Sequence, residues 1–154
     1  MTRDFPDASF DVIYTRDMML HVATKEAMLA RLLGWLKPGG KLLITDYARS
    51  DAEPSPAFAA YIAQRGYDLR PVAAYGRVLE DAGFADVKAE DRTDQFIACL
   101  DAELGRVEAG KAAFVARFGA AGHAAVVDGW KDKLERARAG EQRWALLMGS
   151  KPRQ

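Results

Sequence analysis

The chain has 154 residues, of which 49% are hydrophobic and 29% are charged, a balance that is ordinary for one soluble globular domain. Its 22 Lys and Arg residues equal its 22 Asp and Glu residues, so no excess of positive charge favours nucleic acid or an anionic membrane as a partner. Cys99 is the single cysteine, which excludes an intramolecular disulfide. The sequence shows neither an apolar run of membrane-spanning length nor a signal peptide, so we expect a cytoplasmic protein.

The first third of the chain has the pattern of a strand–helix–strand unit. Residues 10–15 (FDVIYT) form a short apolar and β-branched run, which predicts a buried strand. A helix over residues 24–36 follows, with Thr24 as its expected cap, and the sequence KPGG predicts a tight turn after it. Residues 41–46 (KLLITD) predict a second strand, and the order indicates a parallel pair with a right-handed crossover.

The rest of the chain alternates further helices and strands. Ser55 and Pro56 predict a helix start, with the helix running to about Arg65, and a second helix opens at Pro71 and ends at Gly83. Residues 84–90 predict a strand. A long helical stretch follows, which we expect Gly119 and Gly122 to break, and then a helix over residues 123–137 and a last strand over residues 143–150. No linker is visible, so we predict one α/β domain over residues 1–154.

The first predicted strand has an unusual position for its composition. Residues 10–15 look buried on both faces, as in a central parallel strand, yet nothing before them could pair on the far side. We therefore expect an unpaired apolar edge that favours pairing with a further segment or another chain.

Among the polar segments, residues 14–21 (YTRDMMLH) follow the carboxyl end of a strand, where ligands bind in open α/β sheets. Asp17 and His21 are four residues apart, so one helical turn would place them on one face. An imidazole suits a general base near neutral pH. By spacing alone, a surface histidine near a helix capped by Asp17 is the favoured interpretation.

A second cluster comprises Tyr47, Tyr61, Arg65 and Tyr67. Tyr61 and Arg65 share a predicted helix face, and Tyr47 follows a predicted strand end. A guanidinium with several phenols suits a phosphate group, and an amphipathic surface patch is the equal alternative. Lys133 reads as a solvated helix charge. The sequence shows no P-loop, zinc-ligand spacing or Gly-x-Ser-x-Gly motif.

Nearly the whole chain resembles phosphoethanolamine N-methyltransferases, and most of all the second methyltransferase unit of the plant enzymes. The segments that carry the resemblance occur in the family's order: FPDASFDVIYTRDMMLH, WLKPGGKLLITDYARS, AAYIAQRGYDL, AYGRVLEDAGF, AEDRTDQF, DGWKDKL and EQRW. LKPGG is common to Rossmann-like methyltransferases, whereas the combination of RDMMLH, ITDY, YIAQRGY and GWKDKL is specific to this family.

The resemblance implies the carboxy-terminal part of a Rossmann-like class I methyltransferase. Its sheet would be incomplete and mostly parallel, with an antiparallel last strand and a helical insertion at the substrate site. The implied reaction is S-adenosylmethionine-dependent N-methylation of phosphoethanolamine and its mono- and dimethyl forms. His21 matches the catalytic histidine and Asp17 a carboxylate beside the amine. Arg16 matches a residue on the cofactor side, and the phosphate group is implied to be held by Tyr47, Arg65, Tyr67 and Lys133, with Tyr61 nearby.

The chain also departs from the family pattern. The glycine-rich cofactor loop, the acidic ribose-binding residue and the tyrosine that partners the catalytic histidine would all lie before Met1, and Ala145 stands where glycine is usual. Two alternatives therefore stay open: a non-catalytic homologue that acts as an interaction partner, and a methyltransferase with another small-molecule acceptor.

One expected outcome concerns the cofactor. Because the cofactor loop of the family is not among these residues, we expect the 154-residue chain by itself to bind S-adenosylmethionine weakly or not at all. Isothermal titration calorimetry measures this directly, and tight stoichiometric binding would contradict the expectation.

Overall fold

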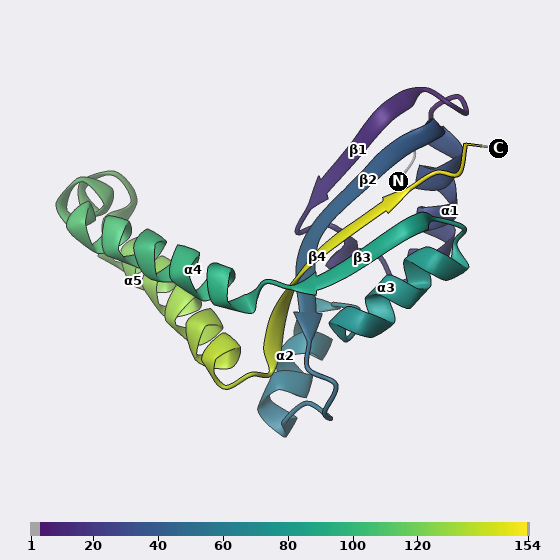
Figure 1. The fold of residues 1–154 in the computed structure, drawn as a ribbon. Coiled ribbons are helices and arrows are strands. Elements are labelled where there is room, and N and C mark those ends of the chain that lie inside the picture. Colours follow the sequence, from purple (N-terminus) through teal and green to yellow (C-terminus); the bar gives the residue numbers. More distant parts are fainter. Residues whose placement is uncertain (1–3, 154) are drawn as a thin grey trace.

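The computed structural model describes residues 4–153, which form one mixed β-sheet with helices on one face and a projecting helical hairpin (Figure 1). The sheet has four strands in the order β1-β2-β4-β3. The strands are β1 (Phe10–Arg16), β2 (Leu36–Arg49), β3 (Ala85–Asp91) and β4 (Gln142–Ser150). The helices are the 3-10 turn η1 (Met19–His21), α1 (Lys25–Trp35), α2 (Pro56–Arg65), α3 (Val72–Asp81), α4 (Thr93–Ala109) and α5 (Lys111–Arg138).

The strand directions confirm the predicted fold class. β1 and β2 pair in parallel, with α1 crossing between them, and Ile13 lies opposite Leu42. β4 is antiparallel to both β2 and β3, so it is the one strand of the four that runs against the others. This is the mostly parallel sheet with an antiparallel last strand that the resemblance implied.

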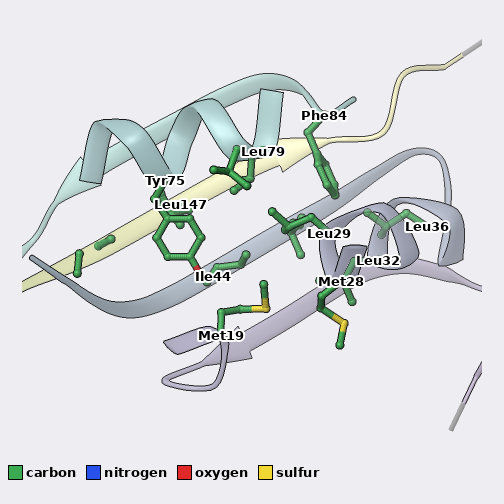
Figure 2. Packing of buried hydrophobic residues seen from close by; sticks show 14 of the residues in the cluster. Met19, Met28, Leu29, Leu32, Leu36, Ile44, Tyr75, Leu79, Phe84 and Leu147 are labelled. Carbon is green, nitrogen blue, oxygen red and sulfur yellow. The ribbon is translucent and has the colours of Figure 1, made fainter. Parts of the chain in front are cut away.

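The main core lies where α1 and α3 cover one face of the sheet (Figure 2). Leu29 and Leu79 from the two helices meet Ile44 and Leu147 from the sheet, and all four side chains are fully buried. Burying each such side chain contributes roughly 1.5–3 kcal/mol. The approach of α3 to the sheet depends on Gly76, because a Cβ there would lie 2.8 Å from that of Ala89.

Two predicted boundaries change in the structure. The expected turn at residues 38–40 is part of β2, which begins at Leu36, and the β1–β2 register shifts between Phe10 and Val12 opposite this segment. A bulge absorbs the residues that the sequence pattern assigned to a turn. Ser55 does cap α2, because its hydroxyl accepts a hydrogen bond from the Phe58 N–H, whereas the Thr24 side chain makes no such bond to α1.

The prediction that the first strand is buried on both faces is wrong for the described part of the chain. Val12 is 61% exposed and Tyr14 is 57% exposed. Both lie on β1, which is an outer strand of the sheet, and among residues 4–153 no strand pairs on its far side. The expected unpaired edge is therefore present.

The helical insertion between β3 and β4 is an α4–α5 hairpin that extends away from the sheet (Figure 1). Its base packs through Phe96, Leu100 and Leu134, which also touch Tyr47 and Trp144. The predicted break at Gly119 is confirmed by backbone angles of φ 78° and ψ 161°. The chain also turns at Gly110, which the pattern did not predict, and it stays helical at Gly122, where a break was expected.

The helices of residues 4–153 can be compared with what a membrane-spanning helix requires. None of them combines the length and the apolar composition that crossing a membrane requires. The predicted cytoplasmic location itself stays a prediction.

A carboxylate lies in the core at the carboxyl end of β2. Asp46 is fully buried, and its Oδ2 accepts a hydrogen bond of 3.0 Å from the Tyr75 hydroxyl. Burial raises the pKa of Asp46 from its ordinary 3.8 to about 6, although bonds from Tyr75 and the Leu20 backbone and the charge of Lys25 partly offset this. The charged form of Asp46 is thus disfavoured in the folded state.

We expect Asp46→Asn to change how stability depends on pH. Below pH 3.8 Asp46 is protonated in both folded and unfolded chains; as pH rises to about 6, only the unfolded chain loses the proton, so the native protein loses stability. The variant does not titrate there, so its stability relative to the native protein should rise by about 3 kcal/mol between pH 4 and 7. Urea unfolding across that range measures the difference, and a difference that does not change with pH would contradict it.

Candidate functional site

A cleft of about 490 Å³ lies between α2 and α5, beyond the carboxyl end of the parallel strands. Three separate parts of the chain form it: β2, α2 with the loop after it, and the second half of α5. A small apolar cluster of Leu20, Phe58 and Leu69 supports the α2 side. The cleft brings together all five residues that are expected to hold a phosphate: Tyr47, Tyr61, Arg65, Tyr67 and Lys133.

Lys133 is a half-buried residue of this cleft and not the solvated helix charge that its position on α5 suggested. Its Nζ donates a hydrogen bond of 2.8 Å to the Tyr47 hydroxyl and lies 5.2 Å from that ring's centre. Burial lowers the pKa of Lys133, the nearby Asp17 carboxylate opposes this, and the positive charges of Arg136 and Arg65 lower it further. Positive charge is therefore concentrated in the cleft, which favours an anionic ligand.

The Tyr47 and Tyr67 phenols stay protonated at neutral pH. Burial is the main cause that raises the pKa of Tyr47, with the Asp17 charge next, and burial also raises the pKa of Tyr67. Tyr47 lies within β2 and not beyond it, as the pattern had suggested. Because Lys133 donates to the Tyr47 oxygen, the Tyr47 proton is free to be donated to an acceptor in the cleft.

Arg136 is a cleft residue that the sequence interpretation missed. Its guanidinium carbon lies 4.0 Å from the centre of the Tyr61 ring, and its Nε donates to Gln142 Oε1 at 3.1 Å. Arg65 approaches the same ring at 5.7 Å. Arg136 follows Lys133 by three residues on one helix, so helical spacing could have identified it.

Asp17 lines a second, smaller cleft of about 330 Å³ that shares Tyr47 and Lys133 with the first. Its Oδ1 accepts a hydrogen bond of 3.1 Å from Trp144 Nε1, and its backbone has a positive φ of 46°. Arg16 lines the same cleft, has a 69% exposed side chain and lies 3.6 Å from the Asp17 carboxylate. The Asp17 carboxylate thus lies in a cleft that shares Lys133 with the cleft that holds Arg65 and Arg136.

The predicted helix face shared by Asp17 and His21 is wrong, because Asp17 lies outside the helical turn and has a left-handed backbone. The 3-10 turn covers only Met19–His21, its cap position is Met18, and neither Met18 nor Asp17 makes a side-chain capping bond there. The exposed His21 ring lies edge-on to Tyr67, with ring centres 5.2 Å apart, and Tyr67 in turn meets Tyr61 at 5.9 Å. His21 therefore adjoins the first cleft through Tyr67.

The arrangement as a whole suits a small zwitterionic ligand. Lys133, Arg65 and Arg136 with three phenols offer donors to an anion, and Asp17 offers an acceptor to a cationic or amine group. Within residues 4–153 no group of three or more His, Cys, Asp or Glu side chains is placed to hold a metal ion.

Comparison with known proteins gives one family match and several close relatives. Residues 2–89 match the profile of a family described as "Methyltransferase domain". The chain is 55% identical to a phosphoethanolamine N-methyltransferase of Triticum aestivum over 97% of its own length and 30% of the relative's. It is 32% identical to the Plasmodium falciparum enzyme of the same name, over 98% of its length and 58% of that protein.

A solved structure has the same fold. Haemonchus contortus phosphoethanolamine N-methyltransferase 2, in complex with phosphomonomethylethanolamine and S-adenosylhomocysteine, superposes with a TM-score of 0.92 at 32% identity. The superposition covers 97% of this chain and 35% of that one. The chain therefore spans about a third of the plant and nematode relatives, and the resemblance to this group is confirmed.

We expect Lys133→Gln to weaken the binding of inorganic phosphate to the protein about tenfold, because a charged hydrogen bond to an anion contributes about 1.5–3 kcal/mol. Lys131→Gln is the matched control, since Lys131 is an exposed neighbour on the same helix. Calorimetric titration with phosphate compares the three proteins. Equal affinity of both variants would show that the cleft charge does not hold the anion.

Proposed function

Because the chain belongs to the methyltransferase-domain family, we propose that it forms the acceptor-binding part of an S-adenosylmethionine-dependent N-methyltransferase. The acceptors are phosphoethanolamine and its mono- and dimethyl forms, and the product series leads to phosphocholine. The observation that carries the proposal is a cleft with three cations and three tyrosines, which shares Tyr47 and Lys133 with a neighbouring cleft lined by the Asp17 carboxylate. The names and ligands of the relatives support the same substrate class.

The cationic side of the cleft would anchor the phosphate. Arg65 and Arg136 both place a planar guanidinium group near the Tyr61 ring, and Lys133 adds a compact charge beside Tyr47. A guanidinium binds phosphate oxygens in pairs, and phenols add single donors. Binding energy from this end of the substrate fixes the other end, which is the one that reacts. An acceptor without phosphate should therefore be a poor substrate.

The amine would lie toward Asp17. The Asp17 carboxylate is held by the Trp144 indole and faces the smaller cleft, so it can accept a hydrogen bond from the amine and orient its lone pair. The amine must lose a proton before its nitrogen can attack, and the His21 imidazole is the group we assign to remove it. The His21 ring contacts Tyr67, which lines the larger cleft.

The cofactor would supply an electrophilic methyl group on its sulfonium. Arg16 is the residue of this chain that we assign to the cofactor side. It fits that role because its side chain is largely exposed at the carboxyl end of β1, next to the cleft that holds Asp17.

A second candidate function follows from the edge of β1. Val12 and Tyr14 are exposed on an outer strand, which favours pairing with another chain or with a further segment of the same protein. A non-catalytic homologue that acts through this edge would bind an intact relative in a pull-down but transfer no methyl group. Activity of the full-length protein on a phosphobase would exclude that reading.

Two variants distinguish the roles of anchor and base. With radiolabelled methyl donor and the full-length protein, Arg65→Ala should raise KM for phosphoethanolamine at least about tenfold with little change in kcat, because it removes a binding group remote from the nitrogen. His21→Ala should lower kcat about 100-fold, as loss of a general base does.

The control is Arg117→Ala, which removes an exposed arginine of α5 that lines neither cleft. Its kinetic constants should equal those of the native protein. No methyl transfer to any of the three phosphobases by the native protein would sink the proposed function, and unchanged constants in both site variants would sink the assigned roles.

A further inference from the structure

A lysine is completely buried beneath the turn that carries His21. Lys25, the first residue of α1, has 0% exposure. Its Nζ donates to the carbonyl oxygen of Met19 at 2.6 Å and to that of Val22 at 3.1 Å. The third contact is the Asp68 carboxylate at 3.5 Å. The ammonium has three donors, and all three have a partner, so Lys25 has no proton left for a ligand.

The same turn is tied from the other side by the loop after α2. The Asp68 N–H donates to the Leu20 carbonyl at 2.9 Å, and the Asp68 carboxylate also accepts from Arg70 at 3.0 Å. Asp68 directly follows Tyr67, whose ring touches His21. The Lys25 ammonium and Asp68 therefore join the turn that carries His21 to the loop that carries Tyr67, one of the residues expected to hold the phosphate.

The contacts of Lys25 and Asp68 with the turn restrict the position of the His21 imidazole. Met19 and Leu20 are buried, whereas His21 is exposed, and the carbonyl groups of the turn are held by Lys25 and Asp68. The neighbours of the ammonium are fixed as well: Tyr75 lies 5.7 Å from it, and the Asp46 carboxylate acts on its charge. A neutral side chain at position 25 would remove the ammonium donor from the Met19 and Val22 carbonyls, and Met19 would keep only the bond from the Val22 N–H, so the turn would be held less firmly.

We propose that Lys25 is a positioning residue, which holds the 19–22 turn so that His21 stays against Tyr67 while the phosphate group is bound. The inference deepens the proposed function and rests on it. It also predicts that Lys25 affects turnover, through His21. Lys25 should not affect the binding of the phosphate, because it does not line the cleft.

A double-mutant cycle in the full-length protein tests this. Lys25→Met should lower kcat for phosphoethanolamine on the order of 10- to 100-fold, as a displaced catalytic group does, and leave KM within about threefold. In a protein that already carries His21→Ala, the same change should lower kcat less than about twofold, since residues that act through one another are not additive. Equal losses in both backgrounds would overturn the proposal, because they would mean a general structural effect.

The matched control is Lys41→Met, which removes an exposed lysine from β2 and should leave kcat unchanged in either background. If Lys25→Met does not fold, Asp68→Asn replaces it. That variant keeps the backbone bond to Leu20 and weakens the ion pair, so it should give a smaller loss of kcat that also vanishes in the His21→Ala background.

An activity-independent measurement separates this proposal from the proposed function. Nuclear Overhauser contacts between the His21 and Tyr67 rings should be present in the native protein and lost in Lys25→Met or weakened in Asp68→Asn. If the native protein methylates none of the phosphobases, the proposed function fails. The ring contact still tests whether Lys25 and Asp68 hold His21 against Tyr67. Retention of the ring contact in the variants would overturn the role of Lys25.

Discussion

β4 is antiparallel and lies between β2 and β3, and the rest of the structure depends on this pairing. β2 and β3 do not touch each other, so the nine residues of β4 are what join the first and second halves of the chain into one sheet. The same strand supplies the site. Its first residue, Gln142, accepts from Arg136, and Trp144 donates to Asp17. Because the strand is paired on both sides, these two contacts have little freedom, and Trp144 forms a fixed part of the smaller cleft.

Desolvation gives the site its electrostatic character. The cleft holds three cations, and Lys133 is half-buried among them, so its ammonium has lost part of its hydration and its pKa is lowered. Such an arrangement costs stability while the cleft is empty of anions, and a bound dianion removes that cost. Asp46 in the core shows the same effect on an acid, because burial raises its pKa to about 6 and the charge of Lys25 offsets this only in part. Burial of a charged group therefore costs stability at both places.

The sequence predicted the elements well where a regular pattern dominates. The apolar runs of residues 10–15 and 41–46 are strands, and the Ser55–Pro56 start of α2 is confirmed with its cap. Predictions failed where three-dimensional pairing overrode a local signal. Proline and two glycines indicate a turn, but the bulge opposite β1 keeps them in a strand.

The burial of individual charged side chains could not be predicted from the sequence pattern either. Lys25 and Lys133 look like ordinary helix lysines, and only the folded chain shows that one supports a turn and the other faces a cleft. The five residues expected to hold a phosphate line one cleft. The absence of a helix face shared by His21 and Asp17 did not follow from their spacing, because a left-handed residue and a 3-10 turn stand where an α-helical turn was assumed.

The attachment of α2 and of the α4–α5 hairpin has a consequence for how such a site evolves. Both are inserted at the ends of strands, and each is fastened to the start of β4 by few polar contacts, one from the Ser55 N–H to Glu141 at 2.7 Å and one from Arg136 to Gln142. The main core beneath α1 and α3 contains no residue of either insertion. Substitutions on the cleft side of these two segments can therefore change which ligand the cleft accepts without changing the packing of the main core.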